Sequence, residues 1–183
     1  QMCIRDRTNI MDIIIVTMSR FDAAYSSTIL SLAKEFAAEH RVFYIDHPLT
    51  IKYFVKNYKT KDIQTRKEAL IWRKNVYRQP FADFEKLTVV IPPLVLPINF
   101  LPKAKNGKAI LYDFFSGVND FFFKKTLNRL IEDFEIKNHV LLNSFNPFFA
   151  QSLPKLKPQK WIYQSLDDMS KACLLYTSDA ADE

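Results

Sequence analysis

Two short β-branched runs, separated by one helix-length segment, constrain the fold of this chain more than any other feature. Asp12–Thr17 (DIIIVT) is almost continuously apolar, which is typical of a strand buried on both faces. Arg41–Asp46 (RVFYID) is a second run of this kind. Between them, Ser19 and Asp22 form an S-x-x-D helix start, and apolar residues follow at helical spacing up to Ala37. Strand, helix and strand in this order predict a right-handed βαβ unit with parallel strands.

The same alternation returns later in the chain. We expect further strands at Leu87–Ile91, Ala109–Tyr112, His139–Asn143 and Lys160–Ser165. Helices are expected over Val118–Phe134, with Phe123, Leu127, Leu130 and Phe134 along one stripe, and from Asn146 to Leu153. Between Pro92 and Pro102 four prolines predict an extended loop. This order predicts an α/β fold, a Rossmann-like, doubly wound and mostly parallel sheet.

The two ends of the chain, residues 1–7 and 173–183, resemble translated sequencing adapter. Met2–Arg7 and Cys173–Ser178 can be encoded by complementary strands of one oligonucleotide, like the inverted ends added by transposon-based library preparation. We therefore expect a native domain at residues 8–172, truncated at its C-terminal end. Without the ends the domain has no cysteine, which excludes disulfides and thiol chemistry, and its net charge rises from +6 to +8.

The scarcity of glycine argues most clearly against a nucleotide-binding motif after the first strand. The chain has only Gly107 and Gly117, and neither follows the first expected strand. Dinucleotide-binding fingerprints and P-loops need glycines there, so that the backbone can approach phosphate groups. An NAD-dependent dehydrogenase or a P-loop nucleotidase is therefore not expected.

Polar residues gather where the expected strands end, which is where doubly wound sheets bind ligands. The candidates for this cleft are Ser19, Arg20, Asp22, His47, Asp113, Asn146, Asp167 and Asp168. For Ser19, Asp22 and Asn146 the alternative interpretation is a helix cap, and for Asp167-Asp168 a solvated loop. His47 stands beside Asp46 at a strand end, but the three histidines lack metal-ligand spacing, so we expect no metal site.

Positive charge is concentrated in Lys52–Arg78, which holds nine basic and two acidic residues. Aromatic residues are interleaved with the basic ones, and this mixture suits either an anionic membrane surface or nucleic acid. A solvated helix pair or hairpin is the third interpretation. The candidates for a membrane surface are Lys52, Lys56, Lys59, Arg66, Lys67, Trp72, Arg73, Lys74 and Arg78.

The order of these elements resembles a known enzyme family. The Ser-Arg loop, the helix STILSLAKEFAAEH, the strand RVFYIDHP, the segment TVVIPP and the run WIYQSLDDMS are similar to the N-terminal half of bacterial GT-B glycosyltransferases of the family 4/group 1 type. Ile162, Tyr163, Asp167 and Asp168 match a V-x-Y-x-x-x-D-D pattern of those relatives. The first loop departs from many of them because it lacks glycines, which puts contact with donor phosphates in doubt.

The resemblance implies an enzyme that moves a sugar from a nucleotide-sugar donor to a cell-surface polysaccharide or lipid-linked acceptor. The N-terminal domain of such enzymes binds mainly the acceptor, and a second α/β domain, expected downstream, binds the donor. The nucleotide-sugar would be a co-substrate, and no tightly bound cofactor is expected. We expect the chain alone to transfer no sugar.

We also expect a cytoplasmic protein, because no stretch approaches the roughly 20 apolar residues of a membrane span. A peripheral contact with the inner face of an anionic membrane would suit lipid-linked acceptors. The main alternative is a stand-alone Rossmann-like domain that binds a ligand or partner without catalysis. Nucleic-acid binding is disfavoured, because the charge lies in one segment and no recognised motif accompanies it.

Overall fold

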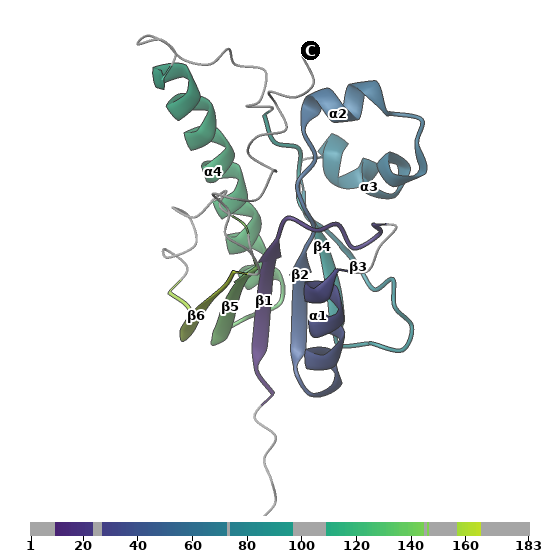
Figure 1. The fold of residues 1–183 in the computed structure, drawn as a ribbon, viewed down its shortest axis with the longest axis vertical. Coiled ribbons are helices and arrows are strands. Elements are labelled where there is room, and N and C mark those ends of the chain that lie inside the picture. The colour runs from purple at the N-terminus through teal and green to yellow at the C-terminus, as the bar shows by residue number, and fades with distance from the viewer. Residues whose placement is uncertain are drawn as a thin grey trace, which may run out of the picture.

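The computed structural model describes residues 10–23, 27–72, 74–96, 109–144, 146 and 157–165. Over these residues the chain forms an α/β fold with one six-stranded sheet in the order β3-β4-β2-β1-β5-β6 (Figure 1). The strands are β1 (Asp12–Thr17), β2 (Arg41–Ile45), β3 (Val76–Arg78), β4 (Leu87–Ile91), β5 (His139–Ser144) and β6 (Lys160–Gln164). All neighbouring strands pair in parallel except β3, which is antiparallel to β4.

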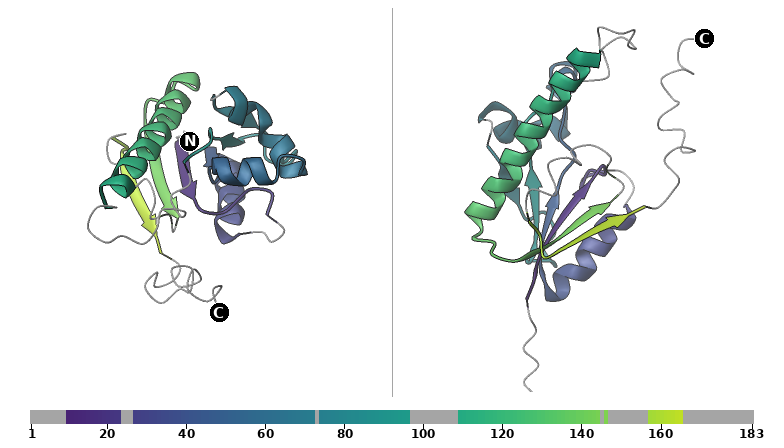
Figure 2. Two further views of the ribbon diagram at one scale, coloured as in Figure 1. Left: turned by 90° about the horizontal axis from the view of Figure 1, so that it is seen from above. Right: turned by 90° about the vertical axis from the view of Figure 1, so that its left-hand side faces the viewer.

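Four helices accompany the sheet in the described residues: α1 (Thr28–Glu39), α2 (Ile51–Lys56), α3 (Lys61–Trp72) and α4 (Ala109–Asp133). Helices α1 and α4 cover opposite faces, as the second view in Figure 2 shows. Successive residues of β1 point to opposite faces. Ile13 and Ile15 therefore pack under α1, while Ile14 and Val16 pack under α4. The expected Rossmann-like, mostly parallel sheet is confirmed.

The central strands could be predicted because they contain uninterrupted runs of buried residues. The four residues Ile13–Val16 are at most 5% exposed, and most residues of the central strands β2, β4 and β5 are buried as well. A strand covered by helices on both faces needs such a run, because neither face meets water. The α4 stripe of Phe123, Leu127 and Leu130 packs in the core, as its helical spacing predicts.

Two expectations about local structure were wrong. Ala109–Tyr112 is not a strand but the first turn of α4, which is 25 residues long. The four residues form a short apolar run, and such a run has no periodicity to separate strand from helix. The first helix begins at Thr28 rather than near Asp22, because Ser27 is the N-cap and its hydroxyl accepts a hydrogen bond from the Leu30 amide at 3.3 Å.

Some expectations lie outside the described residues. These are the body of the short helix expected from Asn146 to Leu153, residues 97–102 of the proline loop and both adapter-like ends. The segment Lys52–Arg78 contains α2, α3 and β3, so the interpretation as a helix pair was correct for its first two elements. Within the part of the chain that the structure describes, no helix has the length and apolar character of a membrane span.

Candidate functional site

The strand order reverses beside β1, and this reversal locates the candidate site. From β1 the chain builds the sheet outward through β2 and β4, and then returns through α4 to place β5 on the other side of β1. At such a reversal the loops after the two central strands leave in opposite directions, and ligands of doubly wound sheets bind there. The relevant loops here are the one after β1, the start of the β2 loop at Asp46-His47, and the end of β5.

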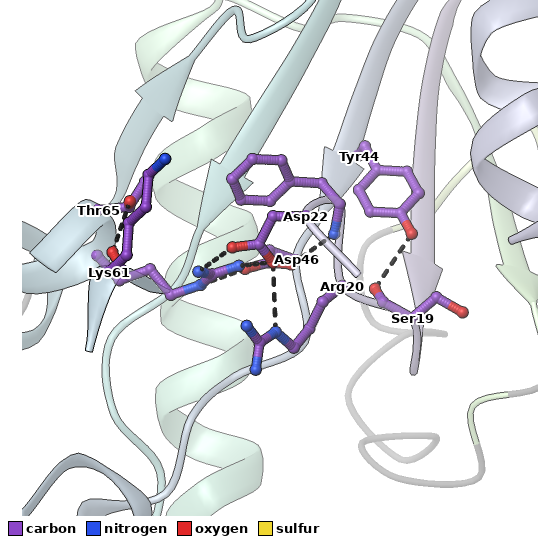
Figure 3. A network of polar contacts seen from close by, with 9 residues as sticks. Ser19, Arg20, Asp22, Tyr44, Asp46, Lys61 and Thr65 are labelled. Atoms are coloured by element: carbon purple, nitrogen blue, oxygen red, sulfur yellow. Dashed lines mark hydrogen bonds and ion pairs between the residues drawn. The ribbon is translucent and has the colours of Figure 1, made fainter. Parts of the chain in front are cut away.

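The loop after β1 is held in place from several sides. The Tyr44 hydroxyl donates a hydrogen bond to the Ser19 carbonyl oxygen at 3.1 Å (Figure 3). The Ser19 amide donates to Thr17 Oγ1 at 3.0 Å. The Asn146 amide group donates to the Thr17 carbonyl oxygen at 3.3 Å. These bonds fix the backbone of residues 17–19 before any ligand arrives, which reduces the entropy that binding must remove.

Arg66 fixes the next part of the same loop. Its guanidinium donates to both Asp22 carboxylate oxygens at 2.8 Å, and its Nε donates to Asp46 Oδ2 at 2.8 Å. Asp46 Oδ1 in turn accepts from the Phe21 amide at 3.2 Å, and the Phe21 ring lies 4.9 Å from the guanidinium carbon. Arg66 is 1% exposed and Asp46 is fully buried, so one cation from α3 joins the β1 loop to the end of β2.

The pKa values of the two acidic partners of Arg66 are shifted in opposite directions. Burial raises the pKa of Asp46, because desolvation of its carboxylate outweighs the attraction of Arg66. For Asp22, burial is the largest influence and raises the pKa, but the hydrogen bonds and charge of Arg66, joined by those of Arg20, together reverse it. The pKa of Asp22 is therefore lowered. Asp22 is ionised at neutral pH and serves as the main counter-ion of the cluster.

Arg20 and His47 lie at the same edge of the sheet and remain partly exposed. Arg20 Nε is 3.3 Å from Asp22 Oδ1, and a hydrogen bond with Tyr53 links Arg20 to α2. Burial opposes the charge on Arg20, yet these partners outweigh it and raise its pKa. Burial, followed by repulsion from Arg20, lowers the pKa of His47, so its imidazole is neutral at pH 7.

The polar residues at the end of β5 are interior. Asn143, Ser144 and Asn146 are each no more than 2% exposed. The Asn143 side chain both donates to the Asn146 carbonyl oxygen at 2.9 Å and accepts from its amide at 3.2 Å. Asn146, a predicted cleft residue, therefore joins the ends of β5 and β1 and offers little surface to a ligand.

The predicted cleft residues thus divide into groups. The structure brings Ser19, Arg20, Asp22 and His47 together at one edge of the sheet, with Asn146 buried behind them. Asp113 does not follow a strand, because Ala109–Tyr112 is helical and Asp113 lies in the early turns of α4. Asp167 and Asp168 lie outside the described residues.

The cationic candidates divide as well. Arg66 was wrongly expected on the surface, because it is buried between Asp22 and Asp46. Lys52, Lys56, Lys59, Lys67, Lys74 and Arg78 are exposed. Arg78 lies 3.6 Å from the Glu68 carboxylate. Trp72 is the last residue of α3, its side chain is not among those described, and Arg73 lies outside the described residues.

Sequence reasoning missed the supporting residues Tyr44 and Asn143 and the interior position of Arg66. Tyr44 and Asn143 are ordinary strand residues; the partner of Tyr44 is 25 residues away in sequence, and that of Asn143 is three residues away, beyond the end of β5. Arg66 did leave a signal. It stands three residues from both Ile63 and Ala69, which are buried, so it lies on the inner stripe of α3.

An apolar pocket lies elsewhere in the described part of the chain. It has a volume of about 410 Å³ on the α1 side of β5 and β6, and mostly apolar side chains line it, including Ile13, Leu32, Phe36, Leu142 and Ile162. Such a lining offers few groups for orienting a polar ligand. Among the described residues no group of three or more His, Cys, Asp and Glu side chains could hold a metal ion.

Comparison of the chain with known protein families, with curated proteins and with solved structures found no match.

Proposed function

We propose that this domain binds the saccharide acceptor of a glycosyltransferase of the GT-B type. One observation carries the proposal: a pre-formed loop presents Ser19 and Arg20 beside His47 at the point where the strand order reverses. All three side chains are partly exposed, whereas the groups that hold the loop in place are buried.

The chemistry of these three groups supports a sugar-phosphate ligand. A hydroxyl and a neutral imidazole exchange hydrogen bonds with sugar hydroxyls, and a guanidinium recognises a phosphate group with directed N–H donors. A glycine-free loop does not let its backbone amides wrap a phosphate group closely, so contact with phosphate would come from the Arg20 side chain, and the hydroxyl-binding groups favour a saccharide over a nucleotide. The acceptor in this proposal is a saccharide carried on a lipid phosphate or pyrophosphate.

The charged groups of the site support binding more than proton transfer. Asp22 and Asp46 are both engaged by Arg66, so neither carboxylate is poised to accept a proton from an acceptor hydroxyl. In a GT-B enzyme the N-terminal domain can bind the acceptor without supplying a free carboxylate, because donor binding and most charge stabilisation belong to a second α/β domain. The proposal therefore requires such a domain, with a nucleotide-sugar as co-substrate, and places the reaction on the cytoplasmic side of a membrane.

The same pairing of both carboxylates favours a second candidate function. A stand-alone Rossmann-like domain that binds a ligand without catalysis needs a rigid polar edge and no free acid or base. The two functions differ in the ligand that is expected to bind. An acceptor domain should bind saccharides selectively, whereas a ligand-sensing or partner-binding domain should show no preference for them.

Calorimetric titration of the 183-residue chain separates them. The probes are a short prenyl pyrophosphate carrying N-acetylglucosamine, the same prenyl pyrophosphate without sugar, UDP-glucose, GDP-mannose and NAD. We expect the sugar-bearing prenyl pyrophosphate to bind at least tenfold more tightly than each of the others. Equal binding with and without the sugar, or preference for a nucleotide, would overturn the acceptor assignment.

A further inference from the structure

The strongest feature outside the candidate site is the outer surface of α2 and the turn after it. Its exposed apolar side chains are Ile51, Val55 and Tyr58, and its exposed lysines are Lys52, Lys56, Lys59 and Lys61. We call this set the basic α2 surface. Val55 is 68% exposed and Tyr58 is 54% exposed.

The spacing of these residues separates them into two adjacent stripes. Ile51 and Val55 stand four residues apart on one side of α2, and Tyr58 is exposed in the turn that follows the end of α2 at Lys56. Lys52 and Lys56 come one position later on the helix, so their ammonium groups lie beside the apolar side chains, and Lys59 lies over the Tyr58 ring in the turn. The opposite side of α2 is anchored, because Phe54 packs against Leu49 and Ile63.

The lysines at 52, 56 and 59 stand in a stretch of sequence without acidic residues, which Asp62 follows directly. From His47 to Lys61 the chain has no aspartate or glutamate. The nearest acidic residue before this stretch, Asp46, is fully buried and engaged by Arg66. An exposed apolar row beside exposed lysines is unfavourable in water but complementary to a bilayer interface, where phosphates meet the lysines and acyl chains meet the apolar row.

We infer that the basic α2 surface docks the protein on an anionic lipid bilayer. The lysines supply attraction at a distance, and Ile51, Val55 and Tyr58 enter the interfacial region. Figure 1 shows α2 and α3 beyond the carboxyl ends of β2 and β4, at the end of the sheet where the chain leaves β1. Tyr53 of α2 is hydrogen-bonded to Arg20, so docking would place the candidate site close to the membrane surface.

Lipid is favoured over nucleic acid by the aliphatic part of the surface. Single-stranded nucleic acids stack on aromatic rings and need little from Ile51 or Val55, whereas a bilayer interface stabilises both. The inference is independent of the proposed sugar transfer, because it concerns α2 and not the loop that would bind a saccharide.

Vesicle co-sedimentation of the full chain tests the inference. We expect binding to vesicles of phosphatidylcholine with one quarter phosphatidylglycerol, little binding to pure phosphatidylcholine, and weaker binding as salt increases. Each lysine near an anionic surface contributes about fivefold to partitioning, so the K52Q/K56Q/K59Q variant should bind about 100-fold more weakly. The matched control K125Q/K137Q/K160Q removes the same charge from exposed lysines on α4, after it and at the start of β6, and should change binding less than fivefold.

The apolar row needs its own variant. Ile51→Ser with Val55→Ser should weaken vesicle binding at least tenfold and leave binding to a 20-nucleotide oligo(dT) unchanged, because bases do not stack on aliphatic side chains. Circular dichroism and thermal melts confirm that each variant is folded. Equal binding to both vesicle types, an equal loss in the control triple variant, or tighter binding to oligo(dT) than to anionic vesicles at the same salt would each overturn the inference.

Discussion

Arg66 in α3 donates two hydrogen bonds at 2.8 Å to the carboxylate of Asp22, which lies 44 residues earlier in the loop after β1. With the further bond from Arg66 to Asp46, this contact determines how the most polar edge of the sheet is built. It also explains why Arg66 belongs to the interior although the adjacent Lys67 is exposed.

Replacement of Arg66 should be strongly destabilising. Arg66→Met leaves Asp46 buried without its cation, and removal of one partner from a buried ion pair costs about 3–5 kcal/mol. Lys67→Met changes the neighbouring exposed residue and should shift the free energy of unfolding by no more than about 0.5 kcal/mol. Urea denaturation measures both, and similar free energies for the two variants would contradict the buried position of Arg66.

Loss of the Tyr44 hydroxyl should loosen the site loop. Tyr44 is fully buried, burial raises its pKa to about 12, and its hydroxyl donates to the Ser19 carbonyl oxygen. Tyr44→Phe leaves that oxygen without this donor and should cost about 1–2 kcal/mol. Tyr163→Phe on the exposed strand β6 is the control and should have almost no effect. Hydrogen exchange at Ser19 should quicken in Tyr44→Phe only; unchanged exchange would mean that the bond does not hold the loop.

His47 should titrate below an ordinary histidine. Burial, followed by the charge of Arg20, lowers its pKa, while an unfolded histidine titrates near 6.5. Below about pH 6.5 the unfolded chain therefore takes up this proton before the folded protein does. The contribution of His47 to stability is thus lost as pH falls from about 6.5 through its folded pKa.

The titration of His47 can be followed by NMR at its Cε1 proton. Removal of the nearby cation in Arg20→Gln should raise the pKa of His47, whereas the same change at the distant exposed residue Arg78 should not. If His47 titrates at or above 6.5 in the unaltered chain, the electrostatic description of the site is wrong.

The outer strand β6 should promote self-association. β6 ends the sheet in the described residues, and Trp161, Ile162 and Tyr163 are 40–51% exposed. An edge strand with exposed apolar side chains pairs readily with another copy, and a lysine on such a strand opposes this. Ile162→Lys should therefore lower concentration-dependent light scattering. Ile10→Lys, outside the sheet, should not; equal effects would point to a general gain in charge instead.

The parts of the fold that the sequence predicted are those that depend on local pattern. The strands β1, β2, β4 and β5 contain apolar runs whose burial on two faces can be recognised from residue type. The start of α4 could not be predicted in the same way, because Ala109–Tyr112 fits either a strand or a helix. The start of α1 was misplaced because serine caps are common, and Ser19 and Ser27 offered competing choices.

The candidate site was less accessible to prediction because its order depends on distant contacts. Ser19, Arg20 and His47 could be placed at strand ends, since parallel strands end at one edge. The partners of Arg66 could not be read from sequence, because Asp22 and Asp46 lie 44 and 20 residues away. A basic residue on the inner stripe of a helix is the pattern that would have revealed a buried cation.

The central claim is that the loop after β1, with Ser19 and Arg20 beside His47, is where a ligand binds. Amide chemical shifts of the ¹⁵N-labelled chain, measured during titration with prenyl-pyrophosphate N-acetylglucosamine, test it most directly. The account predicts that the largest changes fall at residues 18–22 and at His47, and that Arg20→Gln weakens binding about tenfold or more. Shifts confined to the apolar pocket between α1 and β6, or affinity unchanged in Arg20→Gln, would contradict it.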